Sequence, residues 1–146
     1  MTEQSGSEQQ GGFPRRDAQG RVRTLGDLLG VCLAGLVIGA LALVLFDWAF
    51  ASIGAGDFGH TNGWLAVILP AWLFWDDFRA WEFGAARVMA AVAAAAIGVF
   101  VGLLVAGLAA AGLPTLFSGT LAAGAFTVVY AMIWFPGVRW LSRRTG

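Results

Sequence analysis

The densest group of charged side chains in the sequence is a short run of acids with one arginine among them. Asp76, Asp77 and Glu82 lie close together, and Arg79 stands between them. If these carboxylates lay together at the cytoplasmic mouth of a membrane protein, they could concentrate cations or dock a partner. The alternative is that they cap a loop and pair with Arg79 or Arg87. We favour this second interpretation, because charges of both signs normally collect where a helix leaves a bilayer.

Few other residues could carry chemistry. The sole histidine, His60, has only Asp57 nearby in a glycine-rich loop, and two such residues cannot form a closed metal site. The single cysteine, Cys32, excludes an intrachain disulfide and lies in an apolar run, where a thiol behaves as a small hydrophobe. The usual nucleophile, nucleotide and zinc motifs are all missing from the sequence. We therefore expect a non-enzymatic protein with no catalytic residue, no cofactor and no bound metal.

The rest of the sequence is dominated by long apolar runs. Val88 to Leu113 is a stretch of 26 residues without a charge, and a helix of that length reaches about 39 Å, enough to cross a hydrocarbon core of about 30 Å. Leu28 to Phe46 and Phe117 to Phe135 are uncharged runs of 19 residues each. Hydrophobic residues make up 58% of the chain and its mean hydropathy is +0.73. These values predict a membrane protein.

One further run is ambiguous. Gly63 to Trp75 holds only 13 uncharged residues, about 20 Å of helix, and Pro70 favours a kink. This helix either continues through the charged cluster or forms a re-entrant or broken element. We favour a full crossing that ends near Trp81, because a re-entrant element would leave some of the arginines on the opposite side of the membrane from the others.

The resulting fold class is an all-α, polytopic membrane protein with a bundle of four transmembrane helices. Thr24 and Asp27 have the spacing of a capping box at the first helix, while Pro136 and Gly137 are expected to end the last one. An uncleaved first helix is favoured over a signal peptide because its apolar run is too long for one. The predicted spans are 26–48, 62–81, 88–112 and 116–135, within a domain of residues 24–137.

The two ends of the chain are predicted to lie outside the bilayer. Residues 1–23 are polar and are expected to form a disordered tail, and residues 138–146 a short basic tail. At the end of the first apolar run, Asp47 is expected to be an interfacial carboxylate.

The arginines predict how the chain is oriented. All nine basic residues are arginines, and they precede the first span, lie in the middle connection or follow the last span. The positive-inside rule then places both termini and the middle connection in the cytoplasm. The lack of lysine, with abundant Ala and Gly, favours a prokaryotic source and hence the inner cell membrane. We expect Arg139, Trp140, Arg143 and Arg144 to contact anionic lipid headgroups.

Small residues recur at every fourth position in two of the predicted helices. Such stripes let a neighbouring backbone approach closely, and they favour close packing between the first and third helices. An interface between copies of the chain is the alternative. The candidate packing residues are Gly35 and Gly39 in the first helix and Ala94, Gly98, Gly102 and Ala106 in the third.

Two functions remain compatible with the sequence. The first is a small structural, assembly or regulatory subunit that associates with itself or with another membrane protein. The second is a homo-oligomeric channel or permease with a path between subunits. Only Thr120, Thr127 and Tyr130 suggest a polar stripe that could line a path, which favours the first function. The expected partners are membrane lipids and a membrane protein, with no role for nucleic acid.

Overall fold

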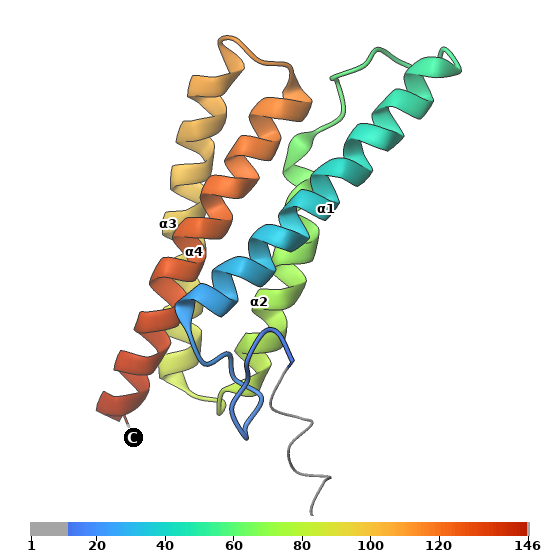
Figure 1. The fold of residues 1–146 in the computed structure, drawn as a ribbon. Helices are drawn as coiled ribbons and strands as arrows, with labels where there is room; N and C mark the ends of the chain where they lie inside the picture. The colour runs from blue at the N-terminus through green and yellow to red at the C-terminus, as the bar shows by residue number, and fades with distance from the viewer. Residues whose placement is uncertain (1–11, 146) are drawn as a thin grey trace, which may run out of the picture.

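The computed structural model describes residues 12–145 and is built from helices (Figure 1). Within these residues the only β-type pairing is an isolated bridge between Arg16 and Val22. The all-α prediction is therefore confirmed. In chain order, the elements are α1 (Leu25–Ser52), the 3-10 helix η2 (Gly63–Val67), α2 (Ile68–Ala80), α3 (Ala85–Ala110) and α4 (Thr115–Thr145).

Three of these helices are long and apolar enough to cross a membrane, as a multi-pass membrane protein requires. They are α1 with 28 residues, α3 with 26 and α4 with 31. Many of their large apolar side chains, such as Leu41, Phe100 and Leu108, are exposed on the outside of the monomer. The remaining helix, α2, has 13 residues and follows η2 directly.

The sequence located the start of the first helix correctly, and a second side-chain cap lies at the start of η2. The Thr24 side chain accepts a hydrogen bond from the backbone N–H of Asp27 at 3.1 Å, and α1 begins at Leu25, directly after Thr24. The Asn62 side chain accepts one from the backbone N–H of Trp64 at 3.0 Å, at the start of η2. Each side chain satisfies a donor that the first turn of a helix leaves free.

The predicted end of the last helix was wrong. Helix α4 continues through Pro136 to Thr145, so residues 138–145 are helical and not a separate tail. Proline removes one helical hydrogen bond, but tertiary contacts compensate for this loss. Val138 is buried, and Arg139 donates from its guanidinium to the carbonyl oxygens of Phe135 and Val22. These contacts hold the last turns of α4 in place.

The predicted disordered tail was also wrong over the part that can be compared. Residues 12–23 form an ordered turn beneath the bundle, whereas residues 1–11 lie outside the described residues. The Asp17 carboxylate accepts hydrogen bonds from the backbone N–H groups of Gln19 and Arg21, and Val22 is only 2% exposed. The low apolar content of this segment concealed one buried residue and a self-capped turn. We refer to residues 12–23 as the N-terminal segment.

Helix pairing differs from the prediction as well. Helix α3 packs along α4, whereas α1 packs on η2, α2 and α4, and the described residues form no extensive α1–α3 interface. Both small-residue stripes do form close contacts, but with other partners. Gly35 and Gly39 of α1 lie against Leu69 and the backbone of Ala66. Elements that follow each other in the sequence usually pack together, and α1 accordingly contacts η2 and α2. The similar stripes on α1 and α3 do not bring those two helices together.

On α3, the stripe faces α4 and η2. Ala94, Gly98 and Gly102 are buried, and Gly98 lies against Phe126 of α4. Gly102 lies against the Trp64 ring and the Ala122 carbonyl. Ala106 is only partly buried, so the stripe packs less closely against its neighbours towards the C-terminal end of α3.

A very close approach of two backbones joins η2 to α4. An ideal Cβ placed on Gly63 would lie 2.0 Å from the Leu116 carbonyl oxygen and 2.4 Å from the Thr120 nitrogen. On the facing helix, a Cβ on Gly119 would lie 2.8 Å from the Trp64 nitrogen. Only glycine fits at both positions, so η2 is seated on α4 at this point.

Candidate functional site

A fully buried carboxylate lies at the end of the bundle where the N-terminal segment meets α2 and α4. Asp77 of α2 is 0% exposed. Its Oδ1 accepts a hydrogen bond from the backbone N–H of Val22 at 2.9 Å, and its Oδ2 accepts one from Nε1 of Trp134 at 2.8 Å. Burying a charge is costly unless it is hydrogen-bonded, and here both oxygens have partners. Asp77 therefore ties three separate parts of the chain together.

Aromatic rings surround this carboxylate. Phe74 lies one turn before Asp77, and its ring is 4.3 Å from that of Tyr130 between centroids. The Tyr130 and Trp134 rings stack at 6.3 Å. The rings exclude water, which strengthens the hydrogen bonds of Asp77.

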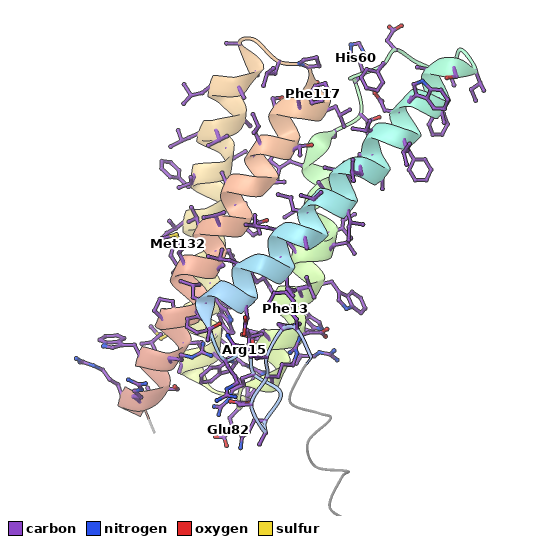
Figure 2. The ribbon with its side chains drawn as sticks, in the orientation of Figure 1. Phe13, Arg15, His60, Glu82, Phe117 and Met132 are labelled. Carbon is purple, nitrogen blue, oxygen red and sulfur yellow. The ribbon has the colours of Figure 1, made fainter. Side chains whose placement is uncertain are left out.

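Arginines fix the N-terminal segment from the outside. Arg139 of α4 donates to the Val22 carbonyl, so Val22 is bound through both its N–H and its C=O. Arg15 pairs with Asp27 at 3.1 Å, and Figure 2 shows Arg15 at this end of the bundle. Arg21 lies over the Trp81 ring, with its guanidinium carbon 4.6 Å from the centroid. The segment is thus docked by buried and by surface contacts.

A basic pocket opens between the N-terminal segment and the end of α4. Its volume is about 420 Å³. Arginines from both elements line it, and they face a single carboxylate, that of Asp17. We call it the basic pocket and define it by Asp17, Arg21, Arg23, Trp81, Arg139, Ser142 and Arg143.

The carboxylate of the basic pocket is committed to one arginine. Partial burial raises the pKa of Asp17, but hydrogen bonds from the backbone and guanidinium of Arg21 outweigh it and hold the pKa below its ordinary value of 3.8. Asp17 is therefore ionised at neutral pH, and its charge is matched by Arg21 at 2.8 Å. The other arginines of the pocket have no carboxylate within ion-pair distance among residues 12–145.

The three predicted acids do not come together at an opening. Asp76 pairs with Arg79 at 2.7 Å on the surface, and Glu82 is exposed beyond the end of α2 (Figure 2). Asp77 points into the bundle instead. Successive residues of a helix point about 100° apart, so adjacent acids face different surroundings. The Asp76–Arg79 pair agrees with the alternative of local pairing.

Another buried carboxylate, that of Asp47, lies near the C-terminal end of α1, at the end of the bundle opposite Asp77 (Figure 1). Asp47 is 5% exposed, and it accepts hydrogen bonds from the backbone N–H groups of Gly59 and Thr61 and from the Thr61 hydroxyl. It was expected to be interfacial. The loop after α1 folds back over it, and a sequence pattern does not reveal such a return. Asp47 therefore holds the connection between α1 and η2.

Replacing Asp47 with alanine is expected to release this loop without unfolding the helices. Three donors would lose their acceptor, so amide exchange at Gly59 and Thr61 should rise by at least tenfold. Hydrogen exchange with mass spectrometry in detergent measures this effect. The matched control is Asp57→Ala, which removes an exposed acid of the same loop. Equal protection in both variants would contradict the assigned role of Asp47.

The remaining candidates of the sequence stay isolated. His60 is exposed, with its Nδ1 3.2 Å from the Asp57 carbonyl oxygen, and Figure 2 places it at the end opposite Glu82. Cys32 is buried in the bundle. Among the described residues, no cluster of three or more His, Cys, Asp or Glu side chains could hold a metal ion.

Sequence reasoning missed several residues of this site. Val22 and Trp134 hydrogen-bond to Asp77 but come from distant parts of the chain. Arg139 was expected to contact lipid headgroups, and its hydrogen bond to the Val22 carbonyl was not foreseen. A partial signal existed, since Trp134 lies one turn after Tyr130 on α4. No signal indicated Val22.

Comparisons with known proteins add no relationship: no family model matches the sequence, and neither the curated proteins nor the solved structures contain a match.

Proposed function

We propose that the protein is a small non-enzymatic integral membrane protein of a prokaryotic inner cell membrane, acting as a structural, assembly or regulatory subunit. The observation that carries this proposal is that the three buried aspartates of residues 12–145, Asp27, Asp47 and Asp77, all bind other parts of the same chain. Asp77 accepts hydrogen bonds from Val22 of the N-terminal segment and from Trp134 of α4. Asp47 accepts them from Gly59 and Thr61 of the loop before η2. Asp27 is paired with Arg15 of the N-terminal segment. The charges between the helices thus serve the fold and are not left open to a passing ion or substrate.

We further propose that the chain crosses the membrane four times with both termini in the cytoplasm. The five residues of η2 and the 13 of α2 together extend about 30 Å, the thickness of a hydrocarbon core. The arrangement of the helices supports this topology. Both ends of the described chain and the α2–α3 connection lie at one end of the bundle, and the other two connections lie at the opposite end (Figure 1). The first of these ends carries the arginines.

The partner in this proposal is a second membrane protein or a second copy of the chain. A groove of about 290 Å³ between α2 and the α3–α4 hairpin supports an association. Its walls are apolar and include Phe74, Phe78, Ala91 and Phe126. In a bilayer, such a groove is filled by lipid or by a partner's side chains, and close packing against a partner gains dispersion energy.

The test combines association with transport. We expect the protein, extracted in mild detergent, to purify as a complex with itself or with another membrane protein. Ala91→Trp would fill the groove and should weaken this complex at least tenfold, whereas Ala93→Trp on the exposed face of α3 should not. Light scattering and mass spectrometry measure the complex. Reconstituted vesicles should show no ion or solute flux. A conducting homo-oligomer would instead establish the channel alternative.

A further inference from the structure

We propose that the basic pocket binds a phosphate group, with an anionic phospholipid headgroup as its source in the membrane. This inference is independent of the proposed subunit role, but it rests on the proposed topology, which places this end of the bundle in the cytoplasm. The pocket combines a concave shape, an excess of positive charge and a position at the end of the membrane-crossing helices.

The charge of the pocket is unbalanced. Four guanidinium groups line it, and the single carboxylate is paired with one of them, Arg21. Arg23 and Arg143 are exposed and make no side-chain hydrogen bond to residues 12–145. Like charges held together repel each other, so an anion between them lowers the free energy of the folded protein. Guanidinium groups also match the oxygens of a phosphate in a bidentate geometry.

The pocket is held in shape by contacts that do not need a ligand. Arg139 is anchored on the carbonyl oxygens of Phe135 and Val22, and it lies 5.2 Å from the Trp81 ring centre. The Asp77 hydrogen bonds fix Val22, the residue between Arg21 and Arg23. A preformed site loses little conformational freedom when its ligand binds.

A buried donor in the wall of the pocket lacks a partner. Nε1 of Trp81 is buried and has no hydrogen-bond acceptor in the described part of the chain. Buried indole N–H groups usually have an acceptor, because an unpaired one costs free energy. The Trp81 ring is therefore held in the pocket wall by packing, with the guanidinium groups of Arg21 and Arg139 over it, and not by a hydrogen bond.

The location of the pocket favours a headgroup as the source of the phosphate. The pocket lies next to the basic C-terminal turns of α4, which follow the apolar part of that helix. Trp140 in these turns is exposed, and tryptophan is enriched at the membrane–water interface. Basic pockets of this kind on the cytoplasmic side bind anionic lipid headgroups. The same oxygens exist on free phosphate, and the experiment must separate the two sources.

The test compares two double variants with the same change in net charge. Arg23→Gln with Arg143→Gln removes the two unpaired arginines of the pocket. The control, Arg16→Gln with Arg79→Gln, removes an arginine of the same segment and a surface arginine of α2, neither of which lines the pocket. The full chain, stripped of lipid in neutral detergent, is titrated with phosphatidylglycerol or phosphatidylcholine. Native mass spectrometry measures the bound lipid, and inorganic phosphate is titrated in a separate arm.

We expect the wild-type protein and the control to bind phosphatidylglycerol at least tenfold more tightly than the pocket variant does. Phosphatidylcholine, which has no net charge, should bind weakly to all three. Binding of inorganic phosphate alone, again lost only in the pocket variant, would support the phosphate site with a soluble source. Equal binding of the anionic lipid by both variants, or no binding of either ligand to the wild type, would overturn the proposal. Unchanged tryptic cleavage at Arg21 in the ligand-free variants checks that the segment remains docked.

Discussion

Replacing Asp77 with alanine should detach the N-terminal segment and lower the free energy of unfolding by about 3 kcal/mol, since two buried donors lose their acceptor. These donors are the backbone N–H of Val22 and Nε1 of Trp134. Asp77→Asn keeps one accepting oxygen and should cost about half as much. Titration with sodium dodecyl sulfate in mixed micelles measures the free energy. Trypsin should cut faster after the arginines of the released segment.

The neighbouring acid provides the control for this prediction. Asp76 is on the surface and pairs only with the exposed Arg79, so Asp76→Ala should change the free energy of unfolding by less than about 0.5 kcal/mol. Its tryptic pattern should match that of the wild type. If Asp77→Ala also leaves the pattern and the unfolding curve unchanged, Asp77 does not hold the segment.

A single methyl group at Gly63 is expected to have a comparable effect through a different cause. In Gly63→Ala the new Cβ would lie 2.0 Å from the Leu116 carbonyl oxygen, a backbone atom that cannot rotate away. Helix η2 must then separate from α4, at a cost of about 3 kcal/mol. The same detergent titration measures this loss, and hydrogen exchange should increase in η2 and in the first turns of α4.

Two further variants show whether the contact with α4 is responsible. Gly56→Ala adds the same methyl group where nothing lies within 4 Å, and it should leave stability unchanged. Gly119→Ala disturbs the contact from the other side, 2.8 Å from the Trp64 nitrogen. Since both clashes are relieved by the same separation, the double variant should cost less than the sum of the two. Additive costs would mean that the two glycines act independently.

The sequence was sufficient for features that depend on local composition and spacing. Uncharged runs located α1, α3 and α4, and the cap at Thr24 located the start of α1. These signals lie within a few residues of what they specify. The small-residue stripes likewise identified contact faces, because a face is a property of one helix.

The partners of those faces could not be predicted in the same way. Gly39 and Gly102 both lie in close contacts, yet one meets Ala66 and the other Trp64, and spacing alone does not distinguish a partner. The fate of Asp77 was equally hidden, since two adjacent acids have the same type and differ only in direction. Arg139 also shows that a long-range contact can keep a helix intact past a proline.

The hydrogen bonds of Asp77 affect the order in which the parts of the chain can reach their folded positions. Its two partners lie 55 residues before it and 57 residues after it. A ribosome delivers the amino-terminal residues first, but their dock is complete only after the indole of Trp134 has been synthesised and α4 has been inserted. The N-terminal segment, although made before all the helices described here, is therefore among the last parts to reach its final position, and its exposure to a protease distinguishes unfinished chains from finished ones.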